Sequence, residues 1–226
     1  MTPDRHPGPL ALVGGNEWGE GCTFDAELLA RAGTDDVLVL PTAAAYEHPE
    51  RAVDTASRWF SPLGANVRGL MVLNRQDASV TEHVDAVRAA RFIYLGGGSP
   101  LHLRSVLKQS PLWQALEEAW RDGAVLAGSS AGAMVLGDPM VDPRGGAFTI
   151  GLGLVEQVAV LPHASKWSAE RMQRTVSLTS AGVALLSIDE RTAVIRDPDG
   201  SWSVSGVGSA AVYVDGVAAG LDALPH

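Results

Sequence analysis

Residues 124–137 read AVLAGSSAGAMVLG, which combines a buried strand, a tight turn and a helix of small residues. Gly128, Ser130 and Gly132 fit the pattern Gly-x-Ser-x-Gly, in which a strained strand-to-helix turn lifts a serine hydroxyl clear of the sheet. Ser129 cannot be the centre of this pattern, because an alanine would then stand at the first glycine. The pattern alone fits an exposed, reactive Ser130 and a glycine-rich connection with two capping serines equally well, so the surrounding sequence has to decide between them.

Upstream of this stretch, short apolar runs alternate with segments of helical periodicity. The expected strands are 10–13, 37–40, 66–73 and 92–95, and the expected helices are 23–32, 48–63, 81–90, 101–108 and 111–122. Such alternation predicts an α/β fold with a mostly parallel sheet and helices on both faces. Loops at the carboxyl ends of parallel strands form the site, so the glycines that follow the fourth strand should meet Ser130.

Downstream of the turn, a loop at 137–146 carries Asp138 and Asp142. An apolar stretch at 155–161 precedes His163, which we expect at the same edge of the sheet as Ser130. A helix is expected at 168–178. The short strands beyond residue 183 are separated by turn residues and predict a short antiparallel extension at the C-terminus.

The chain has 226 residues, which suits a single domain. We expect a flexible lead-in at 1–8, an α/β core at 9–180 and C-terminal strands at 181–226. The 46% hydrophobic and 19% charged residues are ordinary for a soluble globular protein. No apolar run reaches about 18 residues, and the first residues lack a secretory signal, so we expect a cytoplasmic protein without a membrane partner.

Charge and cysteine content exclude further classes of function. The net charge is -9 and the arginines do not cluster, which argues against a nucleic-acid partner. Cys22 is the only cysteine of the sequence, so neither an internal disulfide nor a cysteine-rich metal site is expected. No paired-histidine spacing supports a metal, and no cofactor is expected.

A serine hydroxyl needs a base to remove its proton and an acid to orient that base. Ser130, His163 and either Asp138 or Asp142 would supply such a set. This constellation predicts transfer of an acyl group to water.

Acyl transfer also requires hydrogen-bond donors for the oxyanion. The expected topology offers the backbone N–H groups of Ala131 and of Gly97 or Gly98. These amides are the expected oxyanion hole.

Five motifs occur in a recognisable order: GGGSP at 96–100, GSSAGA at 128–133, GLGL at 151–154, PH at 162–163 and IDERTA at 188–193. In this order the chain resembles the dipeptidase E and cyanophycinase family of serine peptidases, family S51. The resemblance covers most of the chain. It implies a class I glutamine amidotransferase-like fold, with Ser130 as nucleophile, His163 as base, and Gly97 and Ala131 at the oxyanion hole.

The resemblance also implies an orienting acid in the loop between the serine and the histidine. Asp138 is preferred narrowly over Asp142 there. Glu190, within the IDERTA motif, is a rival.

The resemblance implies a small peptide as substrate, with aspartyl dipeptides and β-aspartyl linkages as the family's targets. An acidic side chain would need a cationic partner, and Arg144, Lys166 and Arg171 flank the expected site. A homodimer is an open alternative.

Two other functions are weighed against a peptidase. One is a catalytically silent amidotransferase-like module that binds a small ligand or a protein partner. The other, a glutamine-dependent amidotransferase, would need a thiolate at the turn, and Cys22 is far from Ser130 in the sequence.

Overall fold

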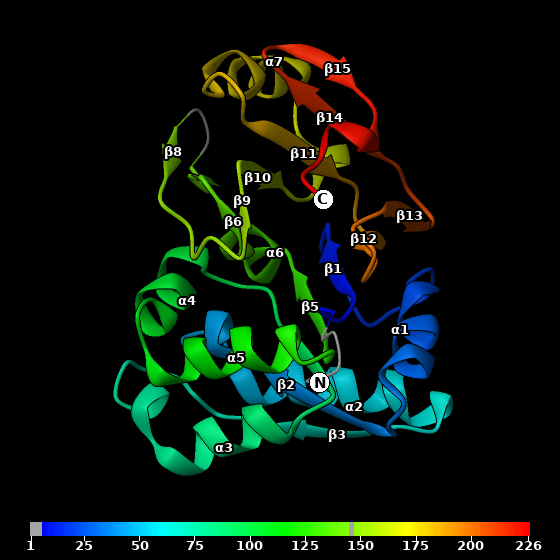
Figure 1. Cartoon of the computed structure of the whole chain (residues 1–226), viewed down its shortest axis with the longest axis vertical. Coiled ribbons are helices and arrows are strands. Elements are labelled where there is room, and N and C mark those ends of the chain that lie inside the picture. Colours follow the sequence, from blue (N-terminus) through cyan, green and yellow to red (C-terminus); the bar gives the residue numbers. More distant parts are fainter. Residues whose placement is uncertain (1–5, 145–146) are drawn as a thin grey trace, which may run out of the picture.

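The computed structural model describes residues 6–144 and 147–226, whose strands form two larger sheets and one small one (Figure 1). The first sheet has the order β13-β12-β1-β5-β4-β2-β3. Its strands are β1 (Leu10–Val13), β2 (Asp36–Leu40), β3 (Asn66–Gly69), β4 (Phe92–Leu95), β5 (Val125–Ser129), β12 (Thr192–Arg196) and β13 (Trp202–Gly206). Strands β1 to β5 are parallel to one another, while β12 and β13 are antiparallel to their neighbours.

Helices cover both faces of the first sheet, as the sequence predicts. One face packs against α1 (Phe24–Ala32) and α2 (Pro49–Phe60). The other packs against α3 (Thr81–Ala89), α4 (Pro100–Leu107), α5 (Pro111–Arg121) and α6 (Ala131–Leu136). Side chains of a strand point alternately to opposite faces, so in β1 Ala11 and Val13 belong to the first core and Leu10 and Leu12 to the second.

The second sheet has the order β15-β14-β11-β10-β6-β9. It consists of β6 (Gly137–Asp138), β9 (Val155–Glu156), β10 (Val158–Leu161), β11 (Ala184–Ile188), β14 (Ala210–Val214) and β15 (Val217–Ala219). Helix α7 (Ala169–Leu178) and strands β14 and β15 form one end of the molecule, opposite α3 and β3 (Figure 1). The chain passes from the second sheet to the first between β11 and β12.

The remaining elements are short. Strands β7 (Met140–Val141) and β8 (Phe148–Thr149) pair with each other. The 3-10 helices are η1 (Thr42–Ala44), η2 (Ser61–Leu63), η3 (Asp77–Ser79), η4 (Ala164–Lys166) and η5 (Leu221–Ala223).

The structure departs from the expected strands in three places. The strand predicted at 66–73 ends at Gly69, because its partner β2 ends at Leu40. The strand predicted at 155–161 is interrupted by Gln157, whose φ is 60°. The expected C-terminal extension is divided, since β12 and β13 join the first sheet while β14 and β15 join the second.

The first residues are only partly a free lead-in. Residues 1–5 of the predicted lead-in lie outside the described part of the chain. Gly8 donates its N–H to Trp120 O (2.7 Å), and its carbonyl accepts from Trp120 Nε1 (2.8 Å), so the chain is held in place from this residue onward. Among the described residues, none of the helices has the length and apolar character to cross a bilayer.

Candidate active site

Ser130 occupies the turn between β5 and α6 in a conformation that is unusual for a residue with a side chain. Its φ is 49° and its ψ is -108°. The glycines on either side allow the close packing that holds this turn: a Cβ on Gly128 would lie 2.7 Å from the carbonyl carbon of Gly132. A Cβ on Gly132 would overlap Leu95 O of β4. The local sequence therefore builds a strained turn that presents the Ser130 hydroxyl.

His163 meets this hydroxyl. Its Nε2 lies 2.9 Å from Ser130 Oγ, and its backbone N–H donates to Gly14 O (2.8 Å), which fixes it beside the end of β1. Gly15 makes room for the imidazole, because a Cβ there would lie 2.6 Å from His163 Nε2. His163 itself has a φ of 54°, so both members of the pair lie on strained backbone.

Glu190 contacts the other ring nitrogen of His163. Its Oε1 lies 3.0 Å from His163 Nδ1, and its Oε2 accepts from Asn16 Nδ2 (3.2 Å) and lies 3.7 Å from Lys166 Nζ. The hydrogen bond with His163, aided by the charge of Lys166, holds the pKa of Glu190 below its ordinary value. The carboxylate therefore stays ionised, which favours a proton on Nδ1 and leaves Nε2 free to accept from Ser130.

Asp138, the sequence-based choice for the orienting acid, lies elsewhere. It pairs with Val158 at the beginning of β10, whereas His163 follows the far end of that strand. Its Oδ1 accepts instead from the N–H of Gly151 (2.9 Å). Asp138 therefore does not contact His163 in the structure, and the carboxylate that does belongs to its rival, Glu190.

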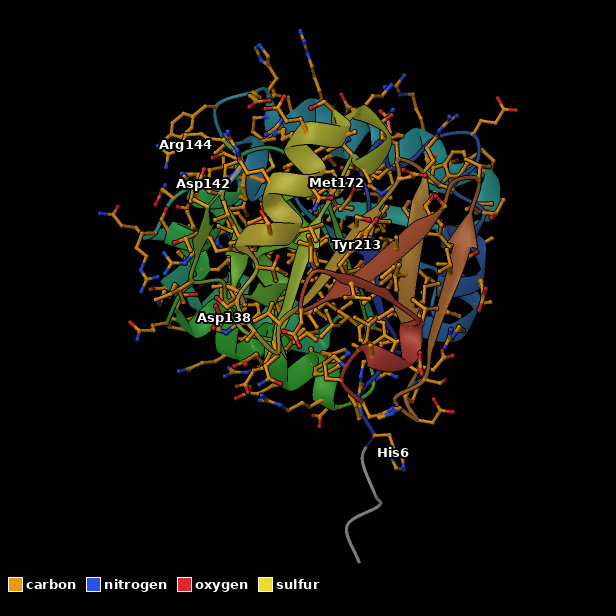
Figure 2. The ribbon with its side chains drawn as sticks, turned by 90° about the horizontal axis from the view of Figure 1, so that it is seen from above. His6, Asp138, Asp142, Arg144, Met172 and Tyr213 are labelled. Carbon is orange, nitrogen blue, oxygen red and sulfur yellow. The ribbon has the colours of Figure 1, made fainter. Side chains whose placement is uncertain are left out.

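Asp142 is engaged by its own neighbour. It accepts from Arg144 Nε (2.9 Å) and Nη2 (2.7 Å), and these bonds lower the pKa of Asp142 to about 2. Figure 2 shows Asp142 and Arg144 together and Asp138 apart from them. None of these three residues contacts His163.

The expected oxyanion donors are only partly available. The N–H of Gly97 donates to Glu17 Oε1 (3.0 Å), and Glu17 Oε2 accepts from Ser129 Oγ (2.7 Å). Within the described residues, the N–H groups of Gly98 and Ala131 have no protein acceptor. Ala131 begins helix α6, whose positive dipole end favours negative charge at this position.

Gly15, Asn16 and Glu17 are site residues that the sequence reasoning missed. None of the motifs considered in the sequence includes these residues. Strand β1 is, however, the parallel neighbour of β5, so the residues after β1 lie beside the Ser130 turn. The position of these three residues directly after an apolar strand was the feature of the sequence that could have assigned them to the site.

The three cations expected near the site differ in their contacts. Lys166 lies close to Glu190, as described above. Arg171 donates to Pro143 O (3.1 Å) and its guanidinium lies 3.8 Å from the centre of the Trp167 ring. Arg144 pairs with Asp142 yet keeps 82% of its side chain exposed.

Neither a metal site nor a reactive thiol is evident in the described residues. They contain no group of three or more histidine, cysteine, aspartate or glutamate side chains arranged to hold a metal ion. Cys22 is buried, and burial raises the pKa of its thiol to about 11. Its thiol is therefore protonated at neutral pH.

Comparison with known proteins gives consistent relatives. The model of peptidase family S51 matches residues 10–201. A cyanophycinase of Thermosynechococcus vestitus is 29% identical, over 93% of this chain and 70% of the cyanophycinase. A cyanophycinase of Geminocystis herdmanii is 30% identical, over 92% of this chain and 81% of the cyanophycinase. The crystal structure of a peptidase from an acI-B1 Actinobacterium superposes with a TM-score of 0.84 at 32% identity, over 94% of this chain and 93% of that one.

A more distant structure has the same fold. It is a putative peptidase E protein from Listeria monocytogenes EGD-e, with a TM-score of 0.69 at 18% identity, covering 89% of this chain and 100% of its own. The family match extends from β1 through β12 and so includes the segments that carry Ser130, His163 and Glu190. The chain belongs to peptidase family S51.

Proposed function

We propose that the protein is a serine peptidase that cleaves small peptides through Ser130, His163 and Glu190. The observation that carries the proposal is the unbroken series of contacts from the Ser130 hydroxyl through both ring nitrogens of His163 to the Glu190 carboxylate. Such a series is what a serine needs to act as a nucleophile near neutral pH.

In the proposed reaction, His163 Nε2 takes the proton of Ser130 as Oγ forms a bond to the scissile carbonyl carbon. The bond from carbon to the leaving nitrogen then breaks, and His163 gives its proton to the departing amine. A water molecule next loses a proton to His163 and attacks the acyl-enzyme ester, which releases the acid and returns the proton to Ser130. Glu190 stays ionised throughout and stabilises the positive charge that His163 carries between these steps.

The oxyanion is proposed to form between the N–H groups of Gly98 and Ala131. Gly98 lies in the loop after β4, and Ala131 begins α6 directly after the Ser130 turn that follows the adjacent strand β5. Neither N–H group has an acceptor among the residues that the structure describes. Gly97, the sequence-based candidate, is the weaker choice because its N–H is engaged by Glu17.

For the substrate we propose a small peptide with an acidic residue on the acyl side, either an aspartyl dipeptide or a β-aspartyl peptide. Exposed positive charge supports this class. Lys166 lies next to the proposed triad and keeps 67% of its side chain exposed, whereas the charge of Arg144 is already paired with Asp142. Cyanophycinases among the relatives are consistent with a peptidase of this family.

The test is a panel of α-aspartyl, β-aspartyl and neutral dipeptides offered to the wild type, Ser130→Ala and the exposed control Ser79→Ala. The wild type and Ser79→Ala should release amino acids, and Ser130→Ala should not. A fluorophosphonate should label the wild type and Ser79→Ala but not Ser130→Ala. If the wild type neither cleaves any peptide nor reacts with the probe, the peptidase proposal fails. A silent ligand-binding module would then be the better account.

A further inference from the structure

Glu17 joins three segments that form the candidate site. It lies in the loop after β1, its Oε1 accepts from Gly97 in the loop after β4, and its Oε2 accepts from Ser129 at the end of β5. Ser129 immediately precedes Ser130. One half-buried carboxylate therefore fixes the loop that carries Gly97 relative to the turn that carries the serine.

Gly97 lies between Glu17 and Ser130. A Cβ on Gly97 would be 3.2 Å from Glu17 Oε1 and 3.5 Å from Ser130 Cβ, so the glycine backbone packs directly against the serine side chain. The Gly97 N–H is directed to Glu17, and the next amide along the loop, that of Gly98, has no acceptor in the described part of the chain.

The far side of the same loop is also fixed. Gly98 has a φ of 134°, and a Cβ there would lie 2.8 Å from Ala44 N. Ser99 N donates to Ala43 O (2.8 Å), which holds the loop against η1. Glu17 is thus the side chain that sets the orientation of the first peptide of the loop, while the backbone of η1 sets that of the last.

We propose that Glu17 is a positioning residue that orients the Gly97 peptide so that the N–H groups of Gly98 and Ala131 converge on the oxyanion. The inference rests on the proposed peptidase function and adds a residue outside the Ser-His-Glu set. The role requires two hydrogen-bond contacts rather than a negative charge. Glutamine would keep both contacts, because its carbonyl can accept from Gly97 while its amide group donates to Ser129 Oγ, with the direction of this second hydrogen bond reversed.

The test measures kcat and KM separately on a peptide that the wild type cleaves. Glu17→Ala should lower kcat about 10²-fold, the usual effect of losing an oxyanion donor, with KM little changed. Glu17→Gln should retain most of the activity. Glu20→Gln, which removes an exposed carboxylate from the same loop, serves as the control and should match the wild type.

Glu17→Asp is a second variant that keeps the proposal testable if Glu17→Ala does not fold. Aspartate keeps the charge but is too short to hold both contacts, so the positioning role predicts that Glu17→Gln is more active than Glu17→Asp. The reverse order, or a rise in KM without a fall in kcat, would overturn the proposal in favour of a role for the charge. Full activity of Glu17→Ala beside an inactive Ser130→Ala would reject only this inference, whereas an active Ser130→Ala would reject the peptidase function itself.

Discussion

Two carboxylates compete for the role of the orienting acid, and single substitutions separate them. Glu190→Gln should lower kcat by about 10³-fold or more, because the amide no longer stabilises the imidazolium of His163. Asp138→Asn should leave kcat within a few-fold of the wild type, since asparagine still offers an oxygen to the N–H of Gly151. Steady-state hydrolysis of one peptide by both variants is the measurement. The opposite ranking would return the role to Asp138.

The contact between Ser130 and His163 was predicted, because each residue follows an apolar strand, but these strands, β5 and β10, lie in different sheets rather than at the shared edge of one sheet. The partner of His163 was not, since the sequence-based preference went to the nearest downstream loop. That loop runs back along β10 and carries Asp138 to the strand's other end. Glu190 reaches His163 because β10 and β11 are parallel neighbours in the second sheet, so the residues that follow their carboxyl ends lie together. The pairing of these two strands, which are more than 20 residues apart in the chain, was not evident from the sequence.

Asp25 is a second carboxyl group whose environment can be tested. It is fully buried in α1, accepts from Trp59 Nε1 (2.8 Å), and its Oδ1 has no hydrogen-bond partner. Burial, with a contribution from the charge of Glu17, raises the pKa of Asp25 to about 8 from an ordinary value of 3.8. Folding therefore takes up a proton between about pH 4 and pH 8, and stability is lost as the pH rises through that range.

Asp25→Asn, which resembles the protonated acid, should remove this loss. Its stability relative to the wild type should grow with pH, by up to roughly 1.4 kcal/mol per pH unit. Urea unfolding at pH 5, 6.5 and 8 measures the difference, with the exposed Asp35→Asn as the control. Parallel pH dependences for the wild type and Asp25→Asn would contradict the assignment.

Among the elements, α6 lies so close to the sheet that glycine is required at its contact with β4. In Gly132→Ala the new Cβ would overlap Leu95 O and lie 2.9 Å from Leu95 Cβ, and a backbone carbonyl inside a strand cannot easily shift. We expect a loss of roughly 1–3 kcal/mol in the free energy of unfolding. Urea denaturation checks this, and Gly19→Ala is the control because a Cβ there meets nothing within 4 Å. Equal stability of the two variants would show that α6 can move away.

Elements with a clear period were predictable, and their boundaries were less so. Helix α5 and strands β1 and β4 lie where periodicity and apolar runs predict them. The strand predicted at 66–73 is shorter because pairing depends on the length of its neighbour, which the residues of β3 do not determine. The break at Gln157 depends on the positive φ of this residue, and no glycine or proline at this position indicates it in the sequence.

In the whole molecule, one hydrophobic core spans both larger sheets. It includes Leu12 and Leu126 of the first sheet together with Val160 and Leu186 of the second. We therefore expect a single domain that unfolds in one transition. Urea curves followed by far-ultraviolet circular dichroism and by the fluorescence of the six tryptophans should coincide. Separate midpoints would show that the two sheets unfold independently.

The division of strands between two sheets was beyond the sequence reasoning, which expected one sheet with a C-terminal extension. Strands β11 and β12 are close in the chain and each is apolar, so nothing local shows that they pair in different sheets. Which sheet each strand joins depends on which sheet still has an unpaired edge strand beside it. β12 covers the edge of β1, and β11 covers the edge of β10.

The position of Glu190 at this crossing has a consequence for the order of events during protein synthesis. The segments that carry Ser130 and His163 leave the ribosome first, and on the proposed mechanism they lack their orienting acid until residue 190 has emerged. Even then, Glu190 reaches His163 only after β11 has paired with β10. A nascent chain would therefore carry the serine and the histidine without their orienting acid until β11 has paired with β10, so on the proposed mechanism full activity comes only after the second sheet has formed.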